Sequence, residues 1–401
     1  MDISHRKVSK RVLFKSSTGE PLVNKKVHVQ QTKHDFLFGC GAFVFLPYLI
    51  KDEQEYQKVT ESWLDIFNYG TLPFYWGQFE KEEGNPNTET LMKTAKYLQS
   101  KGVTVKGHPL CWHTACADWL MKYDNKTILE KQLARIDREV IGFKGVIDMW
   151  DVINEVVIMP IFDKYDNAIT RLCKEHGRVG LIKKVFDEAH AANPNAVLLI
   201  NDFNTSTNYE ILIDGCLNAG VPISAIGIQS HQHQGYWGKE KLEEVLARYE
   251  HFGLPIHFTE NTLISGEIMP PHIVDLNDWK VEKWPTTPEG EERQAREIEE
   301  MYRILFSHPL VSAITTWDYR DGAWLHAPSG FIRKDNTLKP SYTMLKDLVK
   351  KEWWTDITVT TDEDGWVAVE AFKGDYHISA GNEAAEAIIN NDDEAEIRLG
   401  R

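Results

Sequence analysis

One pattern repeats eight times between about residues 36 and 350: a short apolar run that ends in polar or aromatic residues, followed by an amphipathic segment. The runs cover residues 36–43, 66–74, 103–112, 146–155, 196–204, 225–233, 255–263 and 311–319. Helical patterns lie between them, for example at residues 90–100, 128–141, 180–192, 239–252 and 291–306. Strands that alternate with helices of this length predict βαβ units and a parallel sheet. Eight units predict a closed (β/α)8 TIM barrel, and an open doubly wound sheet is the alternative that the pattern leaves open.

Both ends of the chain differ from this repeat. Residues 8–32 alternate in period two around Gly19-Glu20-Pro21-Leu22, which predicts a hairpin-like pair of strands. Residues 355–400 alternate again, with turns at residues 362–365 and 374–376. Neither end is long enough to form a stable sandwich alone. We therefore expect strands from residues 1–35 and 353–401 to pair in one small β-sandwich of structural role, with the barrel of residues 36–352 inserted between them.

The composition limits the partners of the chain. Its 401 residues leave room for a barrel of about 250 residues and a small module. A net charge of −15 disfavours nucleic acid and anionic membranes, because phosphate binding requires Lys and Arg. No apolar run approaches the roughly 18 residues that would suggest a membrane span. The 13 Trp residues suit carbohydrate, since the C–H face of a sugar stacks on an indole ring.

Cysteine spacing and the N-terminus give further expectations. The five Cys residues form no C-x-x-C pair, so we expect neither a disulfide framework nor a zinc site. No phosphate-cradling glycine loop or metal-ligand cluster indicates a cofactor. Residues 1–7 lack an apolar signal core. If a signal peptide has been removed, we expect a secreted or periplasmic protein; if not, we expect a cytoplasmic one. We also expect a monomer.

Two glutamates stand out among the 60 acidic residues because of where they lie. Glu155 ends the fourth apolar run and Glu260 ends the seventh. Core packing does not explain a charge there, although a helix N-cap or an ion pair would explain each one alone. Strands four and seven lie on opposite sides of an eight-stranded barrel, so the two carboxylates can face each other across a substrate. Glycoside hydrolysis needs such a pair.

Six motifs in order strengthen this interpretation. They are Gly107-His108-Pro109-Leu110-Cys111-Trp112-His113, Trp150-Asp151-Val152-Ile153-Asn154-Glu155, Asn201-Asp202-Phe203-Asn204, Gly227-Ile228-Gln229-Ser230-His231, Thr259-Glu260, and Trp317-Asp318 through Trp324. Together they resemble glycoside hydrolase family 10, whose best-known members are endo-1,4-β-xylanases. The resemblance covers about residues 36–350.

The resemblance implies a role for each matching residue. Glu155 would be the general acid/base and Glu260 the nucleophile of a retaining enzyme, with carboxyl groups about 5–5.5 Å apart and His231 near Glu260. The implied substrate contacts are His108, His113, Asn154, Asn201, Gln229, His231 and Trp317, with Trp112 and Trp324 as stacking walls. Trp112 and His113 could instead be packing at the top of the barrel, and His108 could be a core histidine with its hydrogen bonds satisfied. His233 shares a strand face with His231 but could equally be solvent-exposed.

The chain also departs from the family pattern. The E-N-x-x-K segment that would bind the next sugar is replaced by residues 71–80, where stacking on Tyr75 or Trp76 could substitute. The amide of an H-S-Q segment is lost at Ala115, and Phe203 replaces a Tyr. Two long loops are expected, at residues 156–179 and at residues 264–289. The second carries Trp279 and Trp284, which could stack on sugar or anchor the loop.

These observations predict a retaining hydrolase that cleaves β-1,4-xylosidic bonds in xylan or xylo-oligosaccharides. An exo-acting or differently specific β-glycosidase is the second hypothesis, because the contacts to the second sugar are altered. A non-catalytic carbohydrate-binding protein on the same barrel is the third.

Overall fold

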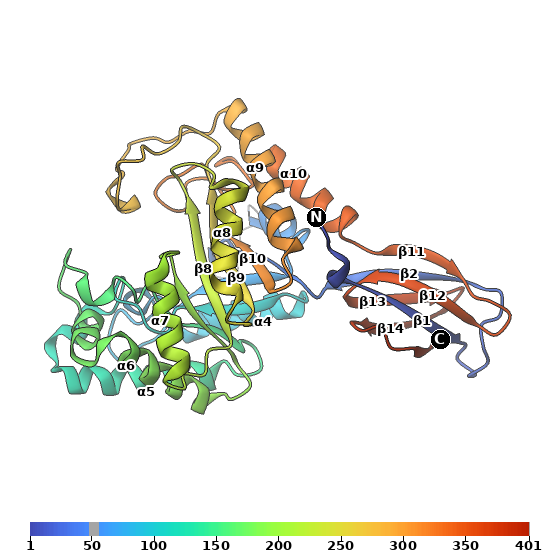
Figure 1. Ribbon diagram of the computed structural model, residues 1–401, viewed down its shortest axis with the longest axis horizontal. Helices are drawn as coiled ribbons and strands as arrows, with labels where there is room; N and C mark the ends of the chain where they lie inside the picture. Colours follow the sequence, from blue (N-terminus) through green and yellow to red (C-terminus); the bar gives the residue numbers. More distant parts are fainter. Residues whose placement is uncertain (48–55, 401) are drawn as a thin grey trace.

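The computed structural model describes residues 1–47 and 56–400, and it contains a closed barrel of eight parallel strands (Figure 1). The barrel strands are β3 (Leu37–Gly41), β4 (Tyr69–Pro73), β5 (Thr104–His108), β6 (Met149–Asn154), β7 (Val197–Asp202), β8 (Ala225–Gln232), β9 (Ile256–Leu263) and β10 (Val311–Thr316). Each apolar run contains one of these strands. β10 pairs in parallel with β3 and closes the ring, so the predicted barrel is confirmed over the open sheet.

Helices cover the outside of the barrel. They are α2 (Gln57–Leu64), α3 (Trp76–Phe79), α4 (Thr88–Ser100), α5 (Asn125–Gly142), α6 (Ala168–Ala192), α7 (Thr207–Asn218), α8 (Gly238–Glu250), α9 (Pro288–Ser307) and α10 (Pro340–Asp347). Short helical turns are η1 (Ser4–Arg6), η3 (Asp118–Lys122), η4 (Met159–Ile161), η5 (Leu276–Asp278) and η6 (Leu348–Glu352). In α5, the Asp124 side chain caps the helix by accepting from Thr127 N, and Ile128, Ile136 and Val140 face the barrel.

The interior of the barrel is a packed core and not a pore. Tyr69, Met149, Leu199, Ala225 and Ala313 point inward from different strands and form one apolar cluster. As in other barrels of this type, the polar residues at the carboxyl ends of the strands therefore form the floor of the active face.

The two chain ends form the expected sandwich. β1 (Lys7–Lys15) pairs with β12 (Trp366–Phe372) and β15 (Ala395–Arg398), while β2 (Lys26–His34) pairs with β11 (Asp356–Thr360) and β13 (Gly374–Ala380). β14 (Glu383–Ile389) completes the second sheet. Val12, Phe14, Val29 and Ile378 are among the apolar side chains buried between the sheets.

The predicted hairpin of residues 8–32 is confirmed only at its turn, where Leu22 N donates to Phe14 O at 2.8 Å and Lys15 pairs with Pro21; it is wrong for the strands themselves. β1 and β2 belong to different sheets, and the chain crosses from one sheet to the other between them. Period-two alternation shows that a strand buries one face, but it does not select the hydrogen-bonding partner. Both N-terminal strands find their partners in the C-terminal segment, some 340 residues away in the chain.

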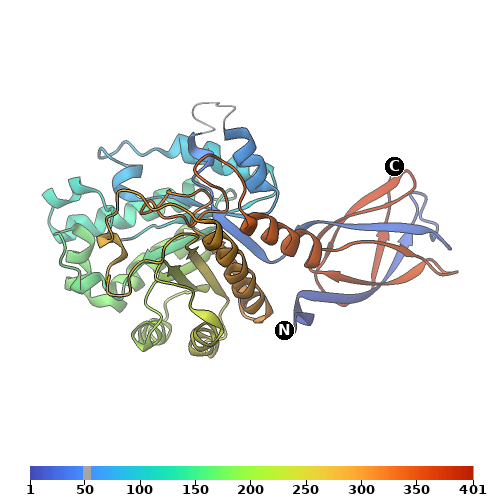
Figure 2. The ribbon, with the colours of Figure 1, turned by 90° about the horizontal axis from the view of Figure 1, so that it is seen from above.

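The sandwich is attached at the amino-terminal end of the barrel strands, away from the face that carries Glu155 and Glu260. Arg6 donates to the carbonyls of Phe306, His308 and Val311 at 2.9, 2.7 and 2.6 Å. Trp353 stacks on Phe306 with ring centroids 4.0 Å apart. Figure 2 shows the sandwich projecting from one end of the barrel.

One of the two expected loops is shorter than predicted. α6 begins at Ala168, so the segment after β6 ends at residue 167 and not at residue 179. Asn167 caps the helix by accepting from Thr170 N, and Gly177 introduces a kink with φ of 68° that interrupts the helical pattern. The segment after β9 extends to Thr287, which caps α9.

Further features of the described residues concern cysteines, membranes and metals. All five cysteines are free, and four of them are buried. Within residues 1–47 and 56–400, the helices are too short or too polar to cross a membrane. The same residues include no cluster of three or more His, Cys, Asp or Glu side chains arranged for a metal ion.

Candidate active site

Glu155 follows the last residue of β6 and is held in an unusual backbone conformation. Its φ is +55°, a region that costs a non-glycine residue roughly 1–2 kcal/mol. Its N–H donates to Asn201 O at 2.8 Å. Trp112 Nε1 donates to Glu155 Oε2 at 2.9 Å, and Gln229 Nε2 lies 3.3 Å from Oε1. Removal of the carboxyl from water and the nearby charge of Glu260 raise the pKa of Glu155 to about 8.

Glu260 lies within β9 and is only 4% exposed. Burial alone would raise its pKa, but His108 and His231 outweigh that effect, so the pKa lies below the ordinary value of 4.5. His231 Nε2 is 3.1 Å from Glu260 Oε2, and His108 Nε2 is 3.8 Å from Oε1. Asn201 Nδ2 donates to Oε1 at 2.9 Å. Glu260 is therefore ionised at a pH where Glu155 holds its proton.

A chain of amide side chains connects the two carboxyl groups. Asn154 Oδ1 accepts from Asn201 Nδ2 at 2.8 Å and from Gln229 Nε2 at 3.0 Å. Asn201 also reaches Glu260, and Gln229 also reaches Glu155. Thr259 Oγ1 fixes the orientation of the Asn201 amide by donating to its Oδ1 at 2.6 Å. The structure thus brings both catalytic candidates and three expected substrate contacts into one network.

His108 is held from below by two buried charges. Its Nδ1 donates to Asp151 Oδ2 at 2.7 Å, since an ionised carboxylate can only accept. Lys106 Nζ lies 2.6 Å from the same oxygen, and the Lys106 and Asp151 side chains are fully buried. Burial would raise the pKa of Asp151, but the Lys106 charge and the His108 hydrogen bond hold it below its ordinary value. Sequence reasoning missed Lys106, because it precedes the motif glycine in a run that reads as strand core.

Two histidines of β8 share one hydroxyl group. Thr262 Oγ1 lies 3.3 Å from His231 Nδ1 and 3.1 Å from His233 Nδ1. The Trp324 ring packs on both histidines, with centroids 4.4 and 4.9 Å away. His233 is fully buried, and burial lowers its pKa to about 3, so the alternative of a solvent-exposed His233 is wrong. The fold buries it because the loop after β9 covers it with Trp284.

The remaining expected contacts are aromatic and histidine side chains that pack around the site. Trp317 packs edge-on against His108 at 5.2 Å. Trp112, expected as a stacking wall, also donates to Glu155. Tyr75 lies at 5.7 Å from both His108 and Trp112, so this aromatic belongs to the site. His113 is 1% exposed and packs on Phe162 at 4.5 Å, in the wall of the site.

Three other tryptophans have structural contacts. Trp76 is buried, and its Nε1 donates to Glu80 Oε2 at 2.9 Å, so of the two candidate replacements only Tyr75 lies beside His108 and Trp112. Trp284 is 4% exposed, and its Nε1 donates to Glu267 O at 2.8 Å. Trp279 packs against Trp284 at 6.0 Å in an apolar cluster inside the loop after β9. These contacts favour loop anchoring over sugar stacking for Trp279 and Trp284.

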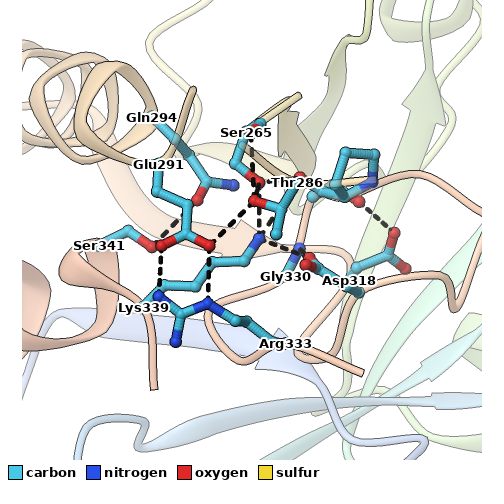
Figure 3. A network of polar contacts seen from close by, with 12 residues as sticks. Ser265, Thr286, Glu291, Gln294, Asp318, Gly330, Arg333, Lys339 and Ser341 are labelled. Carbon is cyan, nitrogen blue, oxygen red and sulfur yellow. Dashed lines mark hydrogen bonds and ion pairs between the residues drawn. The ribbon is translucent and has the colours of Figure 1, made fainter. Parts of the chain in front are cut away.

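A buried polar network joins the roots of the loops after β9 and β10 (Figure 3). Lys339 Nζ lies 2.5 Å from Asp321 Oδ1 and 2.8 Å from Ser265 Oγ. Ser329 Oγ donates to Asp318 Oδ2 at 2.5 Å. Burial raises the pKa of Asp318 to about 7. The network supports the segment that carries Trp317 and Trp324. Its residues lie far apart in the sequence, so no local motif predicted it.

The arrangement defines a class of protein. Two carboxyl groups whose pKa values are shifted in opposite directions lie near the carboxyl ends of β6 and β9, among amide and aromatic side chains. In a (β/α)8 barrel, this arrangement is typical of a glycoside hydrolase. The family model of glycosyl hydrolase family 10 matches residues 51–348. The chain belongs to this family.

Several known proteins are similar to it. An endo-1,4-β-xylanase/feruloyl esterase of Xylanibacter ruminicola is 26% identical over 65% of this chain and 39% of its own length. The anti-sigma-I factor RsgI6 of Acetivibrio thermocellus is 25% identical over 93% of this chain and 45% of its own length. The chain therefore spans less than half of either relative. Xylanase 10B of Thermotoga petrophila, solved with xylobiose, has a TM-score of 0.64 at 21% identity, covering 79% of this chain and 95% of that one.

Proposed function

We propose that the protein hydrolyses β-1,4-xylosidic bonds with retention of configuration, with Glu155 as general acid/base and Glu260 as nucleophile. The observation that supports this proposal most is the difference between the surroundings of the two carboxyl groups: Glu155 is bonded to the neutral Trp112 indole, whereas Glu260 lies beside His108 and His231. A donor must be protonated near neutral pH and a nucleophile must be ionised, and the pKa shifts of Glu155 and Glu260 have these directions.

In the first step, Glu260 Oε attacks the anomeric carbon while the Glu155 proton passes to the leaving oxygen. The glycosidic C–O bond breaks, and a glycosyl ester forms on Glu260. The Asn201 amide and His231 hold Glu260 so that one lone pair can face the sugar. Their hydrogen bonds restrict the carboxylate to one orientation, which lowers the entropic cost of the attack.

In the second step, Glu155 acts as the base. Esterification removes the negative charge of Glu260, which is one of the two main causes of the raised Glu155 pKa. The pKa of Glu155 then falls, and its carboxylate can take a proton from the water that attacks the anomeric carbon. The ester C–O bond breaks, and Glu260 leaves as the carboxylate.

The xylan part of the proposal rests on relatives and on the aromatic walls. A relative that matches 65% of this chain is named as an endo-1,4-β-xylanase/feruloyl esterase. Four aromatic side chains surround the histidines and the carboxyl pair: Tyr75, Trp112, Trp317 and Trp324. Their ring faces suit the flat apolar faces of xylose units.

A second function is carbohydrate binding without cleavage. The relative that matches most of this chain, including the sandwich strands, is named as an anti-sigma factor and not as an enzyme. A barrel that only sensed polysaccharide would need the aromatic walls but not the opposed carboxyl groups. The intact pair and its network of Asn154, Asn201 and Gln229 favour catalysis.

The test is the release of xylose or xylobiose from xylotetraose by the protein and three variants. Glu155→Ala and Glu260→Ala should each lower kcat by at least about a thousandfold. Glu267→Ala is the matched control, because Glu267 is an exposed carboxylate on the segment that follows β9. Binding of xylotetraose without cleavage by the unaltered protein would favour the sensing function instead.

A further inference from the structure

Two segments of the active face are joined by an ion-pair bridge. Lys164 lies in the segment between β6 and α6, and its Nζ is 2.5 Å from Asp275 Oδ2 and 3.0 Å from Asp278 Oδ1. Both aspartates belong to the long segment between β9 and α9. Hydrogen bonds to the two carboxylates raise the pKa of Lys164, so its charge is retained over the whole neutral range.

The bridge starts and ends at the catalytic strands. The segment that carries Lys164 begins at Glu155, and the segment that carries Asp275 begins directly after β9, the strand that contains Glu260. In the barrel order, β7 and β8 lie between β6 and β9. The two segments and their bridge therefore make an arch from one catalytic carboxylate to the other, on the β7–β8 side. Figure 1 shows the long segment before α9 reaching far out past the strand ends.

Each side of the arch is anchored independently of Lys164. On the β6 side, Val157 N donates to Asp202 Oδ2 at 3.0 Å, and Thr170 Oγ1 donates to Met159 O at 3.1 Å. On the β9 side, Met269 N donates to His233 O at 2.9 Å, and Gln234 Nε2 donates to Ile273 O at 2.7 Å. An exposed ion pair contributes little stability by itself. The four hydrogen bonds therefore position the two sides of the arch, and the ion pairs of Lys164 join them.

The arch lies on the opposite side of the ring from the aromatic and histidine contacts of the site. The aromatic and histidine contacts Tyr75, His108 and Trp317 come from β4, β5 and β10, which form the other side of the ring. A sugar chain held there and cleaved between Glu155 and Glu260 must continue towards β7 and β8. It then passes beneath the arch, where the exposed Phe203 follows β7.

The edge of the arch is also apolar. Tyr165 and Val274 are direct neighbours of Lys164 and Asp275 in the chain, and they are 47% and 100% exposed. Ile161, in the same segment as Lys164, is 70% exposed. The arch therefore carries exposed apolar side chains beside its ion pairs.

We propose that Lys164 is a specificity-determining residue: the arch that it closes makes the protein prefer short xylo-oligosaccharides to polymeric xylan. This inference rests on the proposed function. A polymer can lie in an open cleft anywhere along its length, but it must insert a free end beneath a closed arch. Short chains have many such ends for their mass, and long branched chains have few.

The experiment compares kcat/KM on xylotetraose and on soluble polymeric xylan, for the unaltered protein and two charge reversals. The unaltered protein should favour xylotetraose by about tenfold or more. Lys164→Glu places a third carboxylate beside Asp275 and Asp278, so the arch should open and the polymer-to-tetraose ratio should rise several-fold. Lys183→Glu is the control, since Lys183 is equally exposed and pairs with Asp187 on α6.

Three outcomes would overturn the inference. Equal attack on both substrates by the unaltered protein, with long fragments released from xylan, would show that the arch admits a polymer. An unchanged ratio in Lys164→Glu would remove Lys164 as the determinant. Inactivity on both substrates would overturn the proposed function and this inference with it, whereas cleavage of xylotetraose with either of the first two results would leave the proposed function intact.

Discussion

At the scale of single residues, the central feature is that two glutamates of the same site differ in protonation. The carboxyl group of Glu155 has neutral donors, Trp112 and Gln229, and the charge of Glu260 nearby. Glu260 has two histidines and an amide. Both residues are glutamates, so the residue type does not decide which one acts as acid and which as nucleophile. The surrounding charges and hydrogen-bond donors decide it.

The pH dependence of kcat/KM follows from these shifts. Activity should fall as the pH rises through about 8, because Glu155 then loses the proton that the leaving group needs. It should fall on the acid side only below the ordinary Glu pKa of 4.5, because the lowered pKa keeps Glu260 ionised down to there. A pH profile on a short oligosaccharide measures both limbs. A basic limb below pH 6 would contradict the account of Glu155.

Lys106 should act on Glu260 through Asp151 and His108. Lys106→Met removes a buried charge and leaves the buried Asp151 carboxylate with only its contact to His108, which costs about 3–5 kcal/mol of stability. The charge of Lys106 also helps to lower the Glu260 pKa, so the acid limb of the pH profile should move to higher pH. Lys106→Arg should restore most of that shift. A destabilised variant with an unmoved acid limb would leave Lys106 with a structural role only.

The sequence predicted the residues of the site better than their contacts. The motifs placed Glu155, Glu260, Asn154 and Gln229 at strand ends, and the barrel then brings them together. They did not show that the Trp112 indole would bond to Glu155, or that Glu155 would adopt a positive φ. Both depend on backbone directions beyond the end of a strand, where no periodicity applies.

At the scale of elements, the site depends on close approach between β7 and β8. Gly227 faces Asn201, and a Cβ at this position would lie 2.4 Å from Asn201 Oδ1. That oxygen accepts from Thr259, and the amide nitrogen of Asn201 reaches Asn154 and Glu260. A glycine in one strand therefore leaves room for the amide that connects the two carboxyl groups.

Gly227→Ala should displace the Asn201 amide. We expect a loss of about tenfold to a hundredfold in kcat from the misplaced nucleophile, and about 1–3 kcal/mol of destabilisation from overpacking. Gly142→Ala at the end of α5 is the control, because no other atom lies within 4 Å of its added methyl group. Full activity in Gly227→Ala would show that Asn201 does not position Glu260.

Element positions were predictable where patterns were long. The eight apolar runs each contain a barrel strand, and the pattern at residues 239–252 lies close to α8 (Gly238–Glu250). The start of α6 was missed because Gly177 breaks its period, so the segment after Glu155 seemed longer than it is. The arch was not predictable, since the Lys164 contacts join residues more than 100 positions apart.

At the scale of the whole molecule, the chain consists of a barrel and a sandwich that is built from both termini. The sandwich docks on the barrel end opposite to the active face, so we expect it to contribute to stability and not to substrate contact. The alternation at both ends predicted a shared sandwich. It could not predict that β1 and β2 would lie in different sheets, because the partners of both strands lie in residues 353–401.

Arg6 should stabilise the junction without affecting catalysis. Arg6→Ala removes three hydrogen bonds to barrel carbonyls, and we expect a loss of about 1–3 kcal/mol in the free energy of unfolding. Arg11→Ala is the comparison, because Arg11 makes an exposed ion pair with Glu394 within the sandwich and should change stability little. Thermal unfolding and kcat/KM on xylotetraose measure the two effects. A large change in kcat for Arg6→Ala would contradict a purely structural sandwich.

The assignment of the catalytic pair is tested most directly by trapping the glycosyl ester. With a fluorinated xyloside that carries a good leaving group, the glycosyl ester forms quickly and is hydrolysed slowly. The ester therefore accumulates on a retaining enzyme. Mass spectrometry of the digested protein should find one added glycosyl group, on the peptide that contains Glu260. No added mass while the xyloside is still turned over, or a label on a peptide without Glu260, would contradict the proposed mechanism.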